Sequence, residues 1–210
     1  MSDYRIGLTG GVGSGKSTVA AMLQALGAGI VDADHLVHDL IAPAGAAIAQ
    51  LRAEFGNDAI SADGGLDRAW MRARAFSDGD VRRRLEAILH PRVRAAAESR
   101  AQALASSVPY TVLVIPLLVE SGDWTSRVRR VLVIDCAEAT QLTRVQARPN
   151  IDRSTAEAIL RAQADRTARL TAADDVLFNE APLTDLQPRV ARLHAVYCRY
   201  ASEAASPGAL

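Results

Sequence analysis

A glycine-rich segment near the start of the chain contains the residues best suited to bind phosphate. Residues 10–17 read Gly-Gly-Val-Gly-Ser-Gly-Lys-Ser and fit the pattern G-x-x-x-x-G-K-S/T. Glycines let successive backbone N–H groups approach phosphate oxygens, and the N-terminus of a following helix adds partial positive charge. In this pattern the ammonium of Lys16 contacts the β- and γ-phosphates of a nucleotide, and the Ser17 hydroxyl is a ligand of Mg²⁺. The sequence therefore predicts a site for ATP and Mg²⁺. The expected nucleotide contacts are Gly11, Gly13, Ser14, Gly15, Lys16, Ser17 and Thr18.

Lys16 is the one lysine in the chain, since the other 23 of its 24 basic residues are arginines. A lysine placed at random among these basic positions would fall in the motif with a chance of 1 in 24. The wide planar guanidinium of arginine cannot replace a compact ammonium inside a tight ring of backbone amides. A guanine-specific GTPase of the Ras type is also unexpected, because that class needs a further lysine in an Asn/Thr-Lys-x-Asp motif. Large motor and AAA-type ATPases need a longer chain, so a small phosphotransferase is the class that remains.

Two carboxylates follow the second short apolar run of the chain. Asp32 and Asp34 stand where this run ends, and parallel α/β sheets bind ligands beyond the carboxyl ends of their strands. We assign Asp34 the role of the base that accepts the proton of an acceptor hydroxyl and orients its oxygen towards the γ-phosphorus. Asp32 is expected to cap the next helix or to hold the metal through water. The run at 112–115 ends in Pro116, where a usual Walker B motif has an aspartate. Glu120, Asp32 or water molecules would then supply the outer contacts of the metal.

Short apolar runs that alternate with helical segments must position these residues. The runs are rich in β-branched residues, which is typical of strands covered on both faces, as in parallel sheets. Apolar residues at helical spacing follow the glycine-rich loop over 16–26. This alternation of strands and helices predicts an α/β fold with a parallel sheet. The predicted strands are 4–9, 29–33, 110–115, 131–135 and 175–178.

The stretch between the second and third predicted strands, 36–108, is longer than a simple crossover requires and has helical patterns. We expect it to form a subdomain on the substrate side. Its expected helices are 43–54, 80–89 and 92–105. Later in the chain, capping-box patterns at 154–157 and 184–187 predict the starts of two helices. The second of these is expected to run to about Ala201.

Charge and composition exclude several classes of protein. The 210 residues include 24 basic and 24 acidic side chains, and this neutral balance argues against a general nucleic-acid-binding protein. No apolar run approaches about 20 residues, and the first residues lack the pattern of a secretion signal. Cys136 and Cys198 have neither metal nor redox spacing, so we expect a cytoplasmic protein. Arginines gather over 68–100 and 144–169, where they are solvated helix surface or contacts for a polyanionic substrate and a closing lid.

Six segments occur in an order that is characteristic of one enzyme family. They are GLTGGVGSGKSTV (7–19), DADHLVHDL (32–40), ILHPRV (88–93), PLLVE (116–120), QLTRVQAR (141–148) and AQADRTARLTAADDVLFN (162–179). Together they resemble dephospho-coenzyme A kinases, over about residues 6–200. The glycine-rich loop alone is common to many families, whereas DAD, LHP and PLL-x-E at these positions are much more discriminating.

The resemblance implies a fold and a reaction. The fold is a three-layer P-loop kinase fold with a five-stranded parallel sheet, a helical acceptor-binding insertion and a small lid. The reaction is the ATP-dependent phosphorylation of the ribose 3′-hydroxyl of dephospho-coenzyme A. Asp34 matches the proposed base of the family, and Arg144 and Arg148 fall in its lid, where they would close on the triphosphate, Arg144 as a catalytic residue together with Lys16. Asn179 matches a position near the ATP base.

Acceptor contacts implied by the resemblance have plainer alternatives. The expected contacts are Asp34, His90, Pro116, Glu120 and Arg169. His90, which precedes a proline, fits a helix boundary equally well, Glu120 fits a surface position, and Arg166 and Arg169 fit a helix surface. One departure from the family is visible. A glycine is frequent two residues after the asparagine, whereas Glu180-Ala181 follows Asn179 in this chain. This departure affects the expected geometry of base binding.

The expected organisation is a single kinase chain in three parts. The nucleotide-binding core covers about 1–35, 108–142 and 170–210, the helical substrate subdomain about 36–107, and the lid about 143–169. We expect a monomer or weak homo-oligomer that binds dephospho-coenzyme A and needs no nucleic acid, membrane or obligate protein partner. Two other functions fit the residues: a kinase of another small molecule, such as a nucleoside monophosphate, shikimate or gluconate, and a regulatory nucleotide-binding module without transferase activity.

Overall fold

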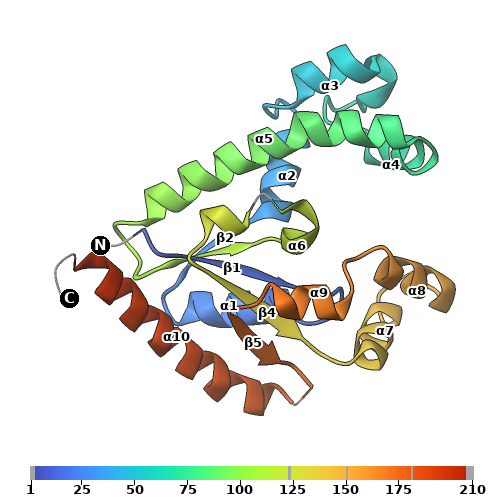
Figure 1. Cartoon of the computed structure of the whole chain (residues 1–210). Coiled ribbons are helices and arrows are strands. Elements are labelled where there is room, and N and C mark those ends of the chain that lie inside the picture. Colours follow the sequence, from blue (N-terminus) through green and yellow to red (C-terminus); the bar gives the residue numbers. More distant parts are fainter. Residues whose placement is uncertain (1–2, 123, 150, 181, 207–210) are drawn as a thin grey trace. The chain divides into compact units, whose positions relative to one another are not determined.

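The structure is a computed structural model in which residues 3–122, 124–149, 151–180 and 182–206 are described (Figure 1). The chain divides into two compact units. The first combines Met1–Val31 with Ala101–Leu210, and the second is Asp32–Arg100. The first unit contains the glycine-rich loop, and the second contains Asp34 and His90, so the two groups of candidate residues are described in turn.

A five-stranded sheet with the strand order β2-β3-β1-β4-β5 forms the centre of the fold (Figure 1). Its strands are β1 (Arg5–Gly10), β2 (Gly29–Asp32), β3 (Thr111–Val114), β4 (Arg130–Asp135) and β5 (Asp175–Phe178). The strands run parallel, and Gly7 of β1 pairs with Leu113 on one side and with Val131 on the other. Because β1 is central and buried at every residue, its sequence is a nearly continuous apolar run. The predicted α/β class and parallel sheet are confirmed, and each strand lies within one residue of its predicted ends.

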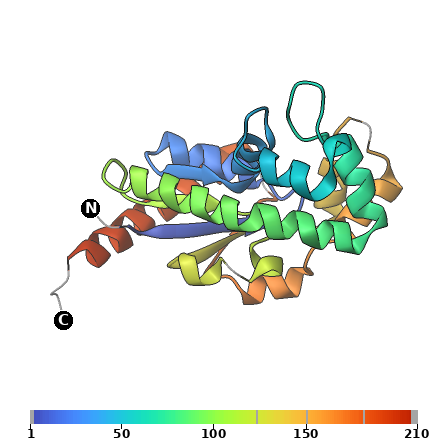
Figure 2. The same cartoon turned by 90° about the horizontal axis from the view of Figure 1, so that it is seen from above.

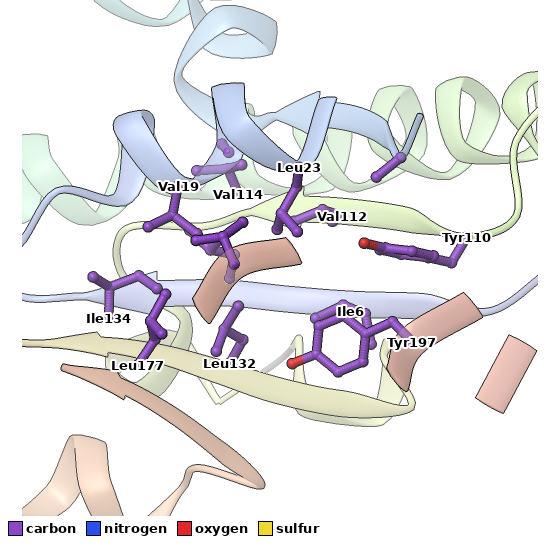
Figure 3. Packing of buried hydrophobic residues seen from close by; sticks show 14 of the residues in the cluster. Ile6, Val19, Leu23, Tyr110, Val112, Val114, Leu132, Ile134, Leu177 and Tyr197 are labelled. Atoms are coloured by element: carbon purple, nitrogen blue, oxygen red, sulfur yellow. The ribbon is translucent and has the colours of Figure 1, made fainter. Parts of the chain in front are cut away.

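One face of the sheet packs against two helices. Ile6 of β1 has no exposed surface and lies in the same core cluster as Val19 of α1 (Lys16–Ala25) and Tyr197 of α10 (Leu183–Ala205) (Figure 3). Burying aliphatic side chains of this size stabilises the fold by about 1.5–3 kcal/mol each. The cluster fixes α1 against β1 and β3, and thereby fixes the loop that joins β1 to α1.

The other face of β1 is covered by a short helix and the chain that follows it. A Cβ on Gly7 would lie 2.7 Å from Leu118 Cδ1 of α6 (Leu118–Ser121) and 3.3 Å from Val128. Glycine at this position therefore lets α6 approach the sheet closely. Further helices of the same unit are η2 (Thr125–Arg127), α7 (Glu138–Gln146), α8 (Arg153–Arg161) and α9 (Arg166–Thr171).

The second unit is helical and has its own core. Its elements are α2 (Ala33–Ile41), α3 (Ile48–Phe55), η1 (Asn57–Ala59), α4 (Arg68–Ser77) and most of α5 (Gly79–Leu104). The buried residues of its core include Ile41, Ile48, Leu51, Met71 and Ile88. The predicted helix at 43–54 starts at Ile48 instead, because residues 42–47 form turns in which Ala44 has a φ of +61°.

The sequence analysis predicted that Pro91 separates two helices, and this prediction is wrong. α5 continues through Pro91 from Gly79 to Leu104 (Figure 2). A proline inside a helix costs about 3 kcal/mol because it removes one hydrogen bond and crowds the preceding turn. Leu89 and Val93, on either side of Pro91, are both buried, and burial of such side chains offsets that cost.

Two helix starts also differ from the predicted capping boxes. The N-cap of α8 is Asp152, whose carboxylate accepts a hydrogen bond of 2.7 Å from Thr155 N–H, so Ser154 is already helical. α10 begins at Leu183 after Pro182, which places Thr184 inside the helix. In both cases a residue slightly earlier in the chain has the backbone geometry of a cap.

Candidate active site

The glycine-rich loop connects the end of β1 to the start of α1. Gly15 is the N-cap of α1 and has a φ of +96°, a left-handed backbone conformation that residues other than glycine rarely adopt. A Cβ on Gly15 would lie 2.2 Å from Asn179 Nδ2, so the space is also too small for one. Since this N-cap has no side chain, the first N–H groups of α1 are not capped by it and remain available to a phosphate.

Lys16 extends back over the loop. Its Nζ donates hydrogen bonds of 2.8 Å to the carbonyl of Gly10 and 3.1 Å to the carbonyl of Gly11. The next residue, Ser17, is exposed at the second position of α1. The ammonium and the hydroxyl thus flank the same helix N-terminus, which is the arrangement expected for binding a triphosphate with its metal ion.

Two residues from later in the chain support the loop. The side-chain Nδ2 of Asn179, which follows β5, donates a hydrogen bond of 2.7 Å to the carbonyl of Ser14. Arg144 of α7 donates to the carbonyls of Gly13 and Asn179 at 3.3 Å and 3.0 Å. The structure therefore brings these two predicted site residues to the loop, where both bind backbone carbonyls. A contact of Asn179 with the ATP base stays a prediction.

Replacing Asn179 with alanine is expected to lower the free energy of unfolding by about 1–3 kcal/mol, because the buried carbonyl of Ser14 loses its partner. Urea denaturation followed by circular dichroism measures this change. Asn57→Ala, at an exposed position of η1, is the control and should leave the unfolding midpoint unchanged. Equal stability of the two variants would show that the Asn179 contact contributes nothing.

Two buried polar residues beside the loop were not anticipated by the sequence analysis. Gln141 of α7 is 5% exposed and lies against the loop, because a Cβ on Gly11 would meet its Nε2 at 2.4 Å. Asp135, at the end of β4, is buried and accepts hydrogen bonds from Nε and Nη2 of Arg166, the shortest at 2.7 Å. This hydrogen bonding raises the pKa of Arg166 above its ordinary value. The position of Asp135 at the carboxyl end of a predicted strand is a signal that could have found it.

Glu180 joins the end of β5 to the start of α7. Its carboxylate accepts hydrogen bonds from Ala137 N–H and from the Thr140 hydroxyl, the latter at 2.7 Å. The bonds to Ala137 and Thr140 lower the pKa of Glu180. The glycine that is frequent in the family would fall at Ala181, which lies outside the described residues.

Glu120 and Arg169 fix the segment between α8 and α9. Glu120 Oε1 accepts a hydrogen bond of 2.8 Å from Ala164 N–H, and the buried Arg169 donates to the Ala164 carbonyl. Pro116 contributes its carbonyl, which accepts a hydrogen bond of 3.2 Å from the Thr9 hydroxyl. For Glu120, Arg169 and Pro116, the structure shows contacts within the chain, and their roles towards an acceptor or a metal stay predictions.

A cavity of about 230 Å³ lies next to this segment. Arg161, Arg166 and Arg169 line it, together with the acidic residues Glu138 and Asp165. Arginine guanidinium groups suit phosphate oxygens. Arg148, by contrast, is exposed just beyond the end of α7 and does not line this cavity.

In the second unit, Asp34 is exposed in the first turn of α2. Asp32 is the N-cap of this helix and accepts a hydrogen bond of 2.9 Å from Asp34 N–H, which is the capping role expected for it. His90 is exposed on α5. The alternative that His90 marks a helix boundary is wrong, because α5 continues past it.

The loop offers a protein oxygen that suits a magnesium ion. Mg²⁺ in nucleotide sites is held by one or two protein oxygens, by phosphate oxygens and by water, and the exposed Ser17 hydroxyl is one such donor. Over the ranges described, no cluster of three or more His, Cys, Asp and Glu side chains forms a metal site made by the protein alone.

Among the described helices, none combines the length and the apolar character needed to cross a bilayer.

A parallel sheet of order β2-β3-β1-β4-β5 with a Gly-Lys-Ser loop between β1 and α1 defines the chain as a P-loop kinase by fold and site. Residues 4–185 match the family described as "CoaE: Dephospho-CoA kinase". The chain belongs to the dephospho-CoA kinase family.

Relatives agree with this assignment, and solved structures agree with the fold. A dephospho-CoA kinase of Burkholderia thailandensis is 51% identical over 202 residues, which cover 96% of this chain and 98% of the relative. The crystal structure of TT1252 from Thermus thermophilus superposes with a TM-score of 0.81 at 32% identity, covering 93% of this chain and 98% of that one. The dephospho-CoA kinase from Campylobacter jejuni has a TM-score of 0.70 at 23% identity, covers 93% and 97% of the two chains, and supports the fold.

Proposed function

We propose that this protein transfers the γ-phosphoryl group of ATP to the ribose 3′-hydroxyl of dephospho-coenzyme A and releases coenzyme A and ADP. The observation that carries this function is the complete glycine-rich loop, with Lys16 and Ser17 at the N-terminus of α1, in a chain of the dephospho-CoA kinase family. Membership of the family indicates the acceptor, and the loop indicates where ATP, the phosphoryl donor, binds.

On the nucleotide side, the chain contributes positive charge and backbone donors. The uncapped N–H groups at the start of α1 bind phosphate oxygens, and the Lys16 ammonium leaves the carbonyls of Gly10 and Gly11 to contact the β- and γ-phosphates. Arg144 and Arg148 stabilise the charge of the transferring group from the lid side. Ser17 would hold Mg²⁺, which would offset the negative charge of the triphosphate.

On the acceptor side, Asp34 takes the proton of the 3′-hydroxyl and orients its oxygen for in-line attack on the γ-phosphorus. His90, Pro116, Glu120 and Arg169 are the proposed contacts to the acceptor. Phosphoryl transfer needs little covalent help from the protein, so correct positioning of the two substrates provides most of the rate.

We also propose a division of labour along the chain. Residues 36–107 bind the coenzyme A part of the acceptor, and residues 143–169 form a lid that excludes water when the substrates are bound. Exclusion of water suppresses wasteful hydrolysis of ATP. The protein acts as a monomer or weak homo-oligomer in the cytoplasm, a compartment that suits its free cysteines, the buried Cys136 and the half-buried Cys198.

A panel of acceptors tests the proposed function. ADP release by the purified protein, with ATP and Mg²⁺, is expected to be stimulated strongly by dephospho-coenzyme A, and mass spectrometry should identify coenzyme A as the product. Adenosine monophosphate, shikimate and gluconate serve as the competing acceptors and should give only the background rate. Strong stimulation by one of them, with none by dephospho-coenzyme A, would overturn the proposal. Tight ATP binding without product from any acceptor would assign the chain to regulatory nucleotide binding instead.

A further inference from the structure

A side chain from the lid end of the chain occupies one backbone donor of the phosphate-binding loop. Val12 N–H donates a hydrogen bond of 2.8 Å to Oε1 of Gln163, a residue that lies between α8 and α9. N–H groups of this loop are otherwise used to bind phosphate oxygens. The carbonyl oxygen of the Gln163 amide thus takes the position of an acceptor at the loop.

The backbone that follows Gln163 is held in place by hydrogen bonds to both the N–H and the carbonyl of Ala164. Ala164 N–H donates to Glu120, and the Ala164 carbonyl accepts from Arg169, which is buried. These contacts limit the positions that the Gln163 side chain can reach. The contact of Gln163 with Val12 is therefore supported by the surrounding backbone of this unit.

The contact lies at the end of the loop that the lysine occupies. Lys16 Nζ binds the carbonyls of Gly10 and Gly11, the two residues that directly precede Val12. In loops of this kind the lysine contacts the β- and γ-phosphates. The carboxamide of Gln163 is consequently placed towards the γ-phosphate end of the nucleotide, and it lines the arginine-bearing cavity of about 230 Å³.

A carboxamide has two ends, and the structure uses only one of them. Oε1 accepts from Val12, while Nε2 has no hydrogen-bond partner among the residues that the structure describes. We propose that Gln163 binds the γ-phosphate of ATP: Oε1 stays on Val12 N–H, and Nε2 donates to a γ-phosphoryl oxygen. This inference rests on the proposed function of the loop as an ATP site, and it makes Gln163 one of the residues that distinguish ATP from ADP.

Gln163→Glu tests the proposal with almost no change in shape. A carboxylate still accepts from Val12 N–H, but it has no donor for the γ-phosphate and adds a negative charge beside it. Isothermal titration calorimetry with Mg²⁺ should show that the Kd of the non-hydrolysable ATP analogue AMP-PNP rises about tenfold or more, the size expected when a hydrogen bond to a charged group is lost. The Kd of ADP, which lacks the γ-phosphate, should change less than about twofold.

Two further variants complete the experiment. Gln163→Met removes both ends of the carboxamide at similar length and should also weaken AMP-PNP more than ADP. Gln187→Glu, at an exposed position of α10, is the matched control for the change of charge and should bind both nucleotides as the wild type does. Equal weakening of AMP-PNP and ADP by the Gln163 variants would mean a structural role, and no change for either would mean no contact; both results overturn the proposal. Failure of the wild type to bind either nucleotide would instead contradict the proposed function.

Discussion

Lys16→Met is expected to lower kcat by at least about 10²–10³-fold, the size typical of removing one donor that stabilises a transition state. The physical reason is that the γ-phosphoryl group spreads negative charge over its oxygens during transfer, and Lys16 is the ammonium that the loop places against it. Methionine has an unbranched side chain one atom shorter than that of lysine, and it carries no charge and cannot donate a hydrogen bond. A coupled assay of ADP release, with dephospho-coenzyme A as the acceptor, measures the change.

Lys16→Arg is the sharper control for this prediction, since it keeps the charge. The carbonyls of Gly10 and Gly11 accept hydrogen bonds of 2.8 Å and 3.1 Å from the compact ammonium of Lys16, and the wider, planar guanidinium of arginine does not reproduce this geometry. Arginine should therefore restore little of the activity. Turnover near the wild-type rate in Lys16→Arg would show that charge alone suffices and that the size of the ammonium does not matter.

Asp34→Asn is expected to lower kcat by about 10²–10⁴-fold, the range typical of losing a general base, while the Kd of ATP stays nearly unchanged. Asparagine keeps the shape of the side chain and cannot accept the proton of the acceptor hydroxyl. Asp34 lies in the first turn of α2, and the cap that starts this helix is the carboxylate of Asp32, so the substitution leaves the helix start intact. Steady-state kinetics and nucleotide titration together separate the effect on chemistry from the effect on binding.

Asp39→Asn is the matched control for Asp34, because Asp39 is an exposed aspartate of the same helix. It should keep the kcat of the wild type. If Asp34→Asn also kept a near-normal kcat, the assignment of the base would be wrong.

Local patterns predicted the parts of the fold that depend on neighbouring residues. Strands β1, β3 and β4 were found because both of their faces are buried, which makes each one an apolar run whose end is marked by glycine, proline or aspartate. The phosphate-binding loop was found because its glycines, Lys16 and Ser17 lie within eight consecutive residues, 10–17. Such features need no knowledge of which distant segments meet.

The features that the sequence analysis missed depend on tertiary contacts. The helix break predicted at Pro91 did not occur, because Leu89 and Val93 are buried on both sides of it, and their burial is decided by the rest of the helical unit. The pairing of Asp135 with Arg166 joins a strand to a helix 31 residues later, and no local spacing reveals it. Polar contacts of this kind can be identified only when the arrangement of the strands in the folded sheet is known.

The hydrogen bond from Asn179 to the Ser14 carbonyl has a consequence for how the protein is made. It spans 165 residues, and the bond from Arg144 to Gly13 spans 131, so the loop near the N-terminus is supported by segments that are synthesised much later. A nascent chain that has presented only its first half outside the ribosome contains the whole phosphate-binding motif but neither of its two supports. The motif is therefore the first part of the site to be translated and among the last to reach its final form, and ATP would find a finished loop only after β5 has joined the sheet.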